Sequence, residues 1–313
     1  MEKKDDFARV NFGTCHSHDG GRLVQFSPSG RLLASAGGFD FKCVVWDVET
    51  QAIQLSDNKS AKNCWFTALA FGPHDQHICS TTKENTISIR DLRDRSAASS
   101  AIRSGHSSKI NSLKMSDDEQ KIMSASEDRQ IKLWDLRNLS EPVERVRVDH
   151  PVRQIAFGSK TLAIALEWNP AATELGVSEF RALSSDSKKT RCRIATGLHT
   201  TLQLSPSTEL VAVASPLYQL RLYNTRRIRE RLICCCAPEH SSRIVGAQFA
   251  AQEKCLITGS YDRSIRVWDI ATGKPTRQVT NLEDVVMSLS TIPNSPGIKA
   301  AAILANGRVC MFG

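Results

Sequence analysis

The sequence has few aromatic residues and no long apolar segment. Phe, Trp and Tyr make up 6% of the 313 residues. No run of 18 apolar residues occurs, so we expect no membrane-spanning helix and no membrane partner. The polar N-terminus, MEKKDD, is not followed by the apolar segment of a secretory signal. These absences exclude the common classes of membrane and secreted chains.

Clustered metal ligands are also missing. The ten cysteines form no C-x-x-C pair, and structural zinc needs ligands at such set spacings. We therefore expect no cofactor, and reduced, buried thiols of an intracellular protein. A redox role for the run Cys234-Cys235-Cys236 stays an alternative. Because the chain also lacks a phosphate-binding loop and a spaced carboxylate pair, we do not expect an enzyme.

What the sequence does contain is a long repeat. Residues 259–269, GSYDRSIRVWD, combine a polar turn, an alternating strand and a final Trp-Asp pair. Near copies are residues 125–135 and 37–47. The position of Trp268, called the anchor below, recurs every 44 or 45 residues. The anchors are Trp46, Arg90, Trp134, Ser178, Tyr223, Trp268 and Phe312.

This Trp-Asp pattern resembles the signature of the WD-repeat propeller family. Seven repeats predict an all-β, seven-bladed propeller of four-stranded blades around a channel, forming one domain over residues 1–313. The last repeat stops at its third strand, and residues 7–12 are predicted to form a separate strand. We expect that N-terminal strand to complete blade seven and so close the ring.

The resemblance implies two buried hydrogen-bonded tetrads. In WD repeats a His, a strand-two Ser or Thr, a turn Asp and the Trp form such a set. Here the sets are His106, Ser124, Asp128 and Trp134, and His240, Thr258, Asp262 and Trp268. The alternative is a hydrolase triad, since His, Asp and Ser occur together. Recurrence at the repeat period favours the structural role.

Basic residues gather in two segments. The chain carries a net charge of +8 and a pI near 9.0, which favours acidic partners. A basic patch on blades four and five is predicted from Arg181, Lys188, Lys189, Arg191, Arg193, Arg226, Arg227, Arg229 and Arg231. It is either a solvated face or a binding site for RNA, DNA or an acidic protein segment. No aromatics lie between these residues, so sequence-specific reading of single strands is not expected.

Several aromatic residues are predicted to share one face of the ring. Four lie at predicted turns between second and third strands, and Trp65 precedes an inner strand. Exposed aromatics of this kind would hold a partner peptide, whereas packing on neighbouring loops is the alternative. The candidate top-face residues are Phe39, Trp65, Trp168, Tyr218 and Tyr261.

A more specific resemblance covers residues 105–181. It is carried by GHSSK at 105–109, KLWDLR at 132–137, LAIALEWNP at 162–170 and ELGVSEFR at 174–181. These stretches resemble the Swd-type WD-repeat subunit shared by COMPASS-type histone methyltransferases and by RNA 3′-end-processing and transcription-termination assemblies. The resemblance implies a non-catalytic, nuclear scaffold that binds peptide segments of larger subunits, with the cytoplasm as a second location. We expect the protein to be monomeric by itself.

Two short boxes suggest a different function. Residues 134–137 (WDLR) and 90–93 (RDLR) resemble the Trp-Asp-x-Arg motif of substrate receptors for cullin-type ubiquitin ligases. In that alternative, Arg93 and Arg137 would contact the ligase adaptor. A third alternative is a propeller that binds nucleic acid directly through the basic patch.

Overall fold

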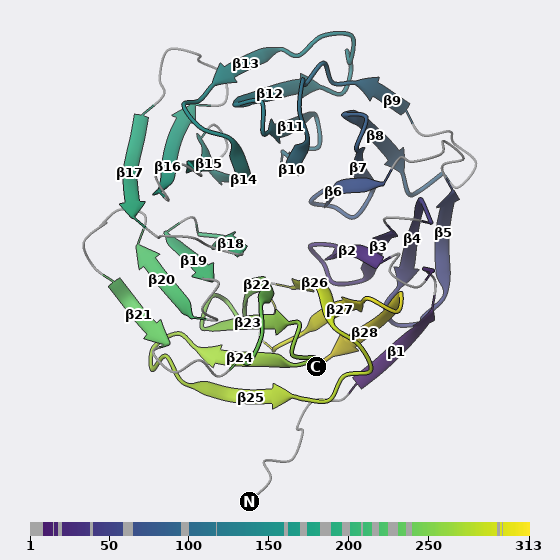
Figure 1. The fold of residues 1–313 in the computed structure, drawn as a ribbon. Helices are drawn as coiled ribbons and strands as arrows, with labels where there is room; N and C mark the ends of the chain where they lie inside the picture. The colour runs from purple at the N-terminus through teal and green to yellow at the C-terminus, as the bar shows by residue number, and fades with distance from the viewer. Residues whose placement is uncertain are drawn as a thin grey trace, which may run out of the picture.

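The structure is a computed structural model, in which the strands are arranged as a ring (Figure 1). It describes residues 9–14, 16–17, 21–37, 40–58, 65–94, 100–116, 118–159, 162–169, 174–181, 189–195, 201–207, 209–214, 219–224, 231–235, 240–292, 295 and 297–313. Within these residues the regular structure is entirely β, with 28 strands in seven four-stranded antiparallel sheets. Each sheet is called a blade below.

The first three blades each take four consecutive strands, which run from the centre of the ring outwards (Figure 1). Blade one is β2 (Gly21–Phe26), β3 (Leu32–Gly37), β4 (Lys42–Asp47) and β5 (Ile53–Asn58). Blade two is β6 (Phe66–Phe71), β7 (His77–Thr82), β8 (Thr86–Asp91) and β9 (Ser100–Arg103). Blade three is β10 (Ile110–Met115), β11 (Lys121–Ser126), β12 (Gln130–Asp135) and β13 (Glu144–Arg147).

The next three blades follow the same order. Blade four is β14 (Val152–Ser159), β15 (Leu162–Asn169), β16 (Glu174–Arg181) and β17 (Lys189–Ala195). Blade five is β18 (Thr201–Leu204), β19 (Leu210–Ala214), β20 (Leu220–Asn224) and β21 (Arg231–Cys235). Blade six is β22 (Ile244–Ala250), β23 (Cys255–Ser260), β24 (Ile265–Asp269) and β25 (Pro275–Val279).

The last sheet, blade seven, joins the two ends of the chain. It contains β26 (Val286–Thr291), β27 (Ala300–Leu304), β28 (Arg308–Phe312) and β1 (Arg9–Thr14). β1 pairs antiparallel with β28, and Arg9 lies opposite Phe312. The ring of Phe12 also meets Trp46 of blade one edge-on, with 5.6 Å between centroids. The N-terminal strand therefore contacts blades seven and one at the point where the ring closes. It covers residues 9–14, whereas the sequence predicted a strand over residues 7–12.

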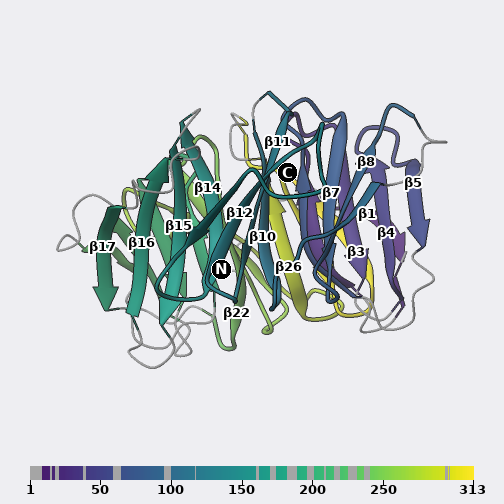
Figure 2. The same cartoon turned by 90° about the horizontal axis from the view of Figure 1, so that it is seen from above.

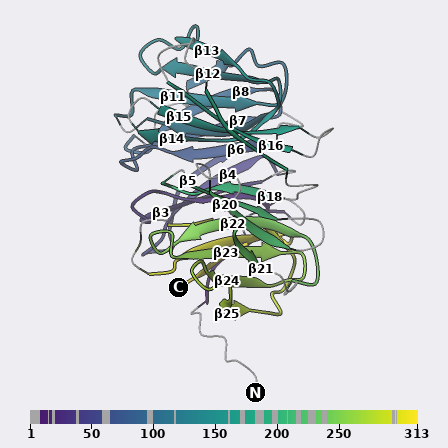
Figure 3. The same ribbon diagram turned by 90° about the vertical axis from the view of Figure 1, so that its left-hand side faces the viewer.

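The strands run between the two flat faces of the ring (Figures 2 and 3). The face that carries the turns between the second and third strands of each blade, together with the loops between blades, is called the upper face. The lower face carries the turns between first and second and between third and fourth strands. Residues far apart in the chain meet on these faces, because every blade contributes the same set of turns.

The two hairpins of blade four place its anchor differently. In blade three, Met115 pairs with Ile122, which pairs with Trp134, and the equivalent inner series in blade four ends at Phe180. On the outer side, the bulge that directly precedes the anchor in blades one, five and six precedes Ser178. Ser178 therefore stays the predicted anchor. The β15–β16 hairpin continues to the pair Asn169–Glu174, so this blade departs from the regular spacing.

The core lies between adjacent blades, and the anchors help to fill it. Trp134 packs in a buried cluster with Ile87 and Cys79 of blade two. Trp268 packs in another with Leu220 and Leu222 of blade five. Each of these anchors thus faces the blade that precedes its own. Because a propeller blade contacts mainly its two neighbours, these contacts hold the ring together.

Candidate interaction surfaces

The two tetrads implied by the sequence are present as hydrogen-bonded chains. In blade three, the His106 Nδ1–H group donates to Asp128 at 2.8 Å, and the Ser124 hydroxyl donates to Nε2 at 2.9 Å. Trp134 Nε1 donates to the same hydroxyl oxygen at 3.0 Å.

Blade six repeats this geometry. The separations are 2.8 Å for His240 Nδ1–Asp262 Oδ2, His240 Nε2–Thr258 Oγ1 and Trp268 Nε1–Thr258 Oγ1. The side chains of His106 and His240 have no exposed surface. A substrate has no access to a nucleophile–base pair buried in this way, so the tetrads serve the fold and not a hydrolase reaction.

A third tetrad occurs in blade one and was not predicted. His16 Nδ1 lies 2.8 Å from Asp40, and His16 Nε2 lies 2.9 Å from the Ser35 hydroxyl. Trp46 Nε1 donates to Ser35 at 3.3 Å. The Asp–Trp spacing of six residues is the same as in the other sets and was the available signal. The Ser–Trp spacing is one residue longer, which hid the match.

The turn aspartates are held in their charged form. Burial by itself would raise the pKa of Asp262, but hydrogen bonds from His240, Ser264 and Ser241 outweigh it, so the pKa lies below its ordinary value. Asp128 shows the same balance, with donors from His106, Gln130 and Ser107. These carboxylates stabilise the turns of the upper face through their bonds to backbone N–H groups.

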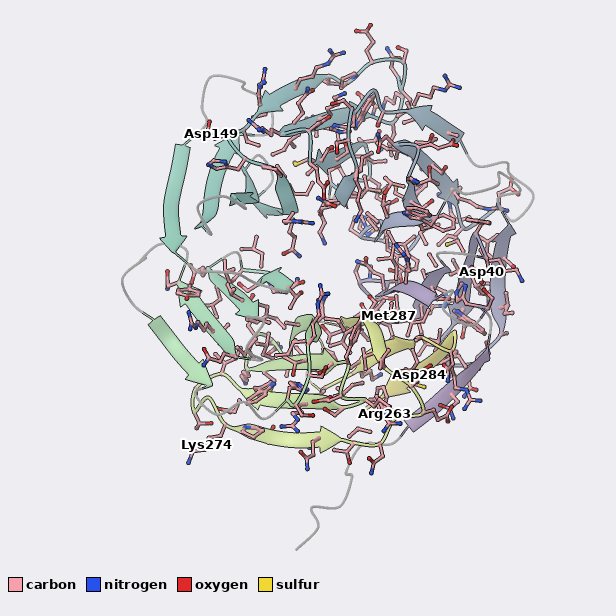
Figure 4. The ribbon with its side chains drawn as sticks, viewed as in Figure 1. Asp40, Asp149, Arg263, Lys274, Asp284 and Met287 are labelled. Atoms are coloured by element: carbon pink, nitrogen blue, oxygen red, sulfur yellow. The ribbon has the colours of Figure 1, made fainter. Side chains whose placement is uncertain are left out.

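Bulges on the inner strands direct additional side chains at the upper face. In blades one to four an extra residue separates the first two pairs of the inner hairpin. A bulge redirects the side chain that it inserts. The inserted residues are Arg22, Thr67, Asn111 and Arg153. Val245 occupies this position in blade six, and Met287, which is labelled in Figure 4, occupies it in blade seven. The bulge residues of blades one to four are therefore polar, and those of blades six and seven apolar.

Trp65 lies within a group of cations on the upper face. Its ring is half-buried, with Lys83 Nζ 4.1 Å and the Arg22 guanidinium 5.4 Å from the ring centroid. Both distances suit cation–π contacts. Trp65 is therefore in contact with two cations, and its role as an anchor for a partner peptide stays a prediction. The ring gives these two cations a fixed position.

Lys109 and Arg153 extend this group towards blade four. Partial burial lowers the pKa of Lys109, and the guanidinium groups of Arg153 and Arg22 lower it further, while Glu127 opposes them. Glu127 also pairs with Arg153 at 3.3 Å. We call the set of Arg22, Trp65, Lys83, Lys109 and Arg153 the upper basic cluster. Among the described residues, four cations thus lie in this cluster with Glu127 beside them, so it suits an acidic ligand.

The other predicted top-face aromatics have different positions. Tyr261 is 38% exposed at its turn in blade six. Trp168 lies inside β15, opposite Leu175, and not in a turn as predicted, because the hairpin of blade four is longer. Phe39 and Tyr218 lie outside the described residues. Of these four, Tyr261 alone is therefore shown with an exposed ring.

Much of the predicted basic patch falls outside the part of the chain that the structure describes. Lys188, Arg226, Arg227 and Arg229 belong to that group. The backbone places Arg181 at the end of β16, Lys189, Arg191 and Arg193 on β17, and Arg231 at the start of β21. β17 and β21 are the outermost strands of neighbouring blades (Figure 1). The patch remains a prediction.

The two Trp-Asp-x-Arg-like boxes lie on the lower face and differ in their contacts. Arg93 Nη2 donates to Asp91 at 2.6 Å, and this hydrogen bond lowers the pKa of Asp91 to about 2. Arg137 Nε donates to Gln120 Oε1 at 2.9 Å. The guanidinium groups thus hold different local partners, and nothing in this geometry tests the ligase alternative.

Neither a metal centre nor a membrane span is found among the described residues. No group of three or more His, Cys, Asp or Glu side chains there has the geometry to hold a metal ion. In the same residues we find no helix of the length and apolarity that a bilayer crossing requires.

Comparison with known protein families adds the decisive observation. The family model described as WD domain, G-beta repeat, matches residues 11–47, 99–135 and 232–269. Each matched segment contains one complete tetrad. The chain thus contains WD40 repeats, and its sheets are arranged as a β-propeller. No curated protein matches this propeller significantly along its sequence. The all-β propeller expected from the repeat is confirmed, whereas the Swd-type resemblance stays a proposal.

Proposed function

We propose that this WD40 propeller is a non-catalytic scaffold that binds an acidic segment of a larger protein through the upper basic cluster. The cluster carries the proposal, because Arg22 and Lys83 lie over one half-buried indole and Lys109 interacts with both Arg22 and Arg153, with Glu127 beside them. WD40 propellers in general bind partner proteins. The exposed ring of Tyr261 adds a second contact on the same face.

The scaffold is proposed to act in a nuclear complex. Residues 105–181 resemble the Swd-type subunit, which supports either a histone methyltransferase complex or a transcription-termination and RNA-processing complex. The net charge of +8 suits an environment rich in nucleic acid and acidic proteins. Burial of the three tetrad histidines supports a role without catalysis.

The identity of the complex is tested by purifying the tagged, full-length protein from its own cells after nuclease treatment and identifying partners by mass spectrometry. We expect a methyltransferase, phosphatase or polyadenylation subunit in near-equal amounts. Recovery of a cullin adaptor alone would favour the ligase alternative. Recovery of nuclease-sensitive ribonucleoproteins alone would favour direct nucleic-acid binding through the basic patch.

The role of the cluster is tested by reversing two of its charges. The variant Lys83→Glu with Lys109→Glu is expected to lose most partner recovery, because it replaces two attractive charges with repulsive ones. The matched control is Lys254→Glu with Lys274→Glu, two exposed lysines at lower-face turns of blade six. Figure 4 shows Lys274 at the outer edge of the ring. Equal partner loss in both variants would contradict the proposal.

A further inference from the structure

The innermost strands of the seven blades carry no carboxylate. These strands are β2, β6, β10, β14, β18, β22 and β26, which face the centre of the ring (Figure 1). Their sequences contain three cations, Arg22, Lys114 and Arg153, and neither Asp nor Glu. Arg22 and Arg153 are bulge residues at the upper end and belong to the upper basic cluster. Lys114 lies near the lower end of β10, so it is a separate charge on the inner wall.

Lys114 shares its level on the inner wall with amide side chains of other blades. It directly precedes Met115, the inner-strand residue in register with the anchor Trp134. The same register places three glutamines at the level of Lys114: Gln25 in blade one, Gln203 in blade five and Gln248 in blade six. Gln248 Nε2 donates to Gln203 Oε1 at 3.2 Å, from one blade to the next. All four side chains are half-buried, so solvent reaches them.

The Lys114 ammonium has no counter-charge among the described residues. Its Nζ atom makes no hydrogen bond and no ion pair with them, and burial lowers its pKa without any carboxylate that opposes the shift. In the turn that follows β10, Asp118 accepts from Ser116 at 2.5 Å and Glu119 accepts from His77 at 2.7 Å. Because an unpaired charge is costly to bury, this ammonium favours an anion from outside the chain.

We propose that the lower end of the inner wall binds one small oxyanion, a phosphate group that is either free or carried by a small ester. The Lys114 ammonium supplies the positive charge and up to three hydrogen-bond donors. The glutamine amides at the same level offer further donors. A polyphosphate chain would add negative charge without a second cation at this level. The site lies at the opposite end of the inner strands from the upper basic cluster, so it does not depend on the function proposed for that cluster.

Phosphate titration of the full-length protein tests the proposal. Inorganic phosphate and glycerol phosphate are titrated separately by isothermal calorimetry, with chloride keeping the ionic strength constant. We expect saturable binding of one ion per chain and a melting temperature that rises with phosphate concentration. Tighter binding of inorganic phosphate would support the free ion as ligand, and tighter binding of glycerol phosphate would support an ester. The proposal is overturned if neither compound binds saturably.

Substitution of Lys114 locates the binding. Lys114→Met keeps a long side chain but removes the charge, so the affinity for phosphate should fall at least about tenfold, the loss expected for one charge-assisted hydrogen bond. Lys83→Met removes a cation of the upper basic cluster and is the matched control, which should leave the affinity unchanged. An equal loss in both variants, or a loss in Lys83→Met alone, would overturn the assignment to the inner wall.

The wild-type protein keeps the test decisive if Lys114→Met does not fold. Nuclear magnetic resonance of isotope-labelled lysine side chains follows the pKa of Lys114 with and without phosphate. Lys114→Arg identifies the signal and, because it keeps the charge, should still bind phosphate. A bound phosphate favours the charged ammonium, so the pKa of Lys114 should rise and the affinity should fall as the pH increases through it. A pKa that is unchanged at saturating phosphate would overturn the proposal.

Discussion

Blades two and three share a backbone pattern but differ at the positions that connect neighbouring blades. Blade three has the tetrad from His106 to Trp134, and its indole is buried against blade two. Blade two has Glu84 at the aspartate position and Arg90 at the anchor, and a groove lies beside blade one. Both sheets nevertheless form four regular strands. The difference shows that the sheet depends on its strand pairing, whereas the anchor decides whether the junction between blades is filled.

This comparison separates the contributions of two anchors within one repeat pattern. A buried indole adds packing area and a hydrogen-bond donor with a fixed partner. An arginine adds charge and leaves the groove beside it unfilled. Substitutions in blade three should therefore cost more stability than the matched substitutions in blade two.

The largest expected effect is on Trp134. Trp134→Ala leaves a cavity between blades two and three and removes the donor to Ser124, so it should lower the free energy of unfolding by about 3–5 kcal/mol. Denaturant unfolding followed by circular dichroism measures the change. Arg90→Ala, at the same register in blade two, is the control and should cost less than about 1 kcal/mol. An equal loss of unfolding free energy in Trp134→Ala and Arg90→Ala would show that the buried indole does not stabilise the junction between blades more than arginine does.

The next effect concerns the serine inside the tetrad. Ser124→Ala removes the hydroxyl shared by His106 and Trp134 and leaves two buried polar groups without that partner, which should cost about 1–3 kcal/mol. Ser80→Ala is the matched change in blade two, where the third strand has Arg90 in place of Trp. We expect a cost below about 0.5 kcal/mol there. Thermal unfolding of both variants measures the difference, and a larger cost for Ser80→Ala would contradict the comparison.

The repeat pattern was sufficient to predict the fold class and two of the tetrads, because regular spacing fixes which residues share a register. It failed where the spacing changed. The hairpin of blade four is longer than predicted and places Trp168 inside a strand, and one added residue in blade one hid the tetrad of His16. Arg22 and Lys83 lie over Trp65 because neighbouring blades bring these residues together. The groove at Arg90 likewise lies between two blades. Such contacts have no signature within a single repeat.

The smallest expected effect is a pH dependence from the third tetrad. Burial lowers the pKa of His16 below the ordinary histidine value of 6.5, although Asp40 opposes the shift. The imidazole is therefore neutral in the fold, and protonation favours the unfolded chain. The stability from this site is fully present above pH 6.5 and is lost as the pH falls from 6.5 through the lower folded-state pKa. One proton limits the slope to about 1.4 kcal/mol per pH unit. Melting temperatures of the wild type and His16→Gln between pH 7.5 and 5 measure it. The variant should be less stable at neutral pH but should lose less stability on acidification, because it lacks this titrating group; parallel curves would mean that His16 binds protons equally in the folded and unfolded states.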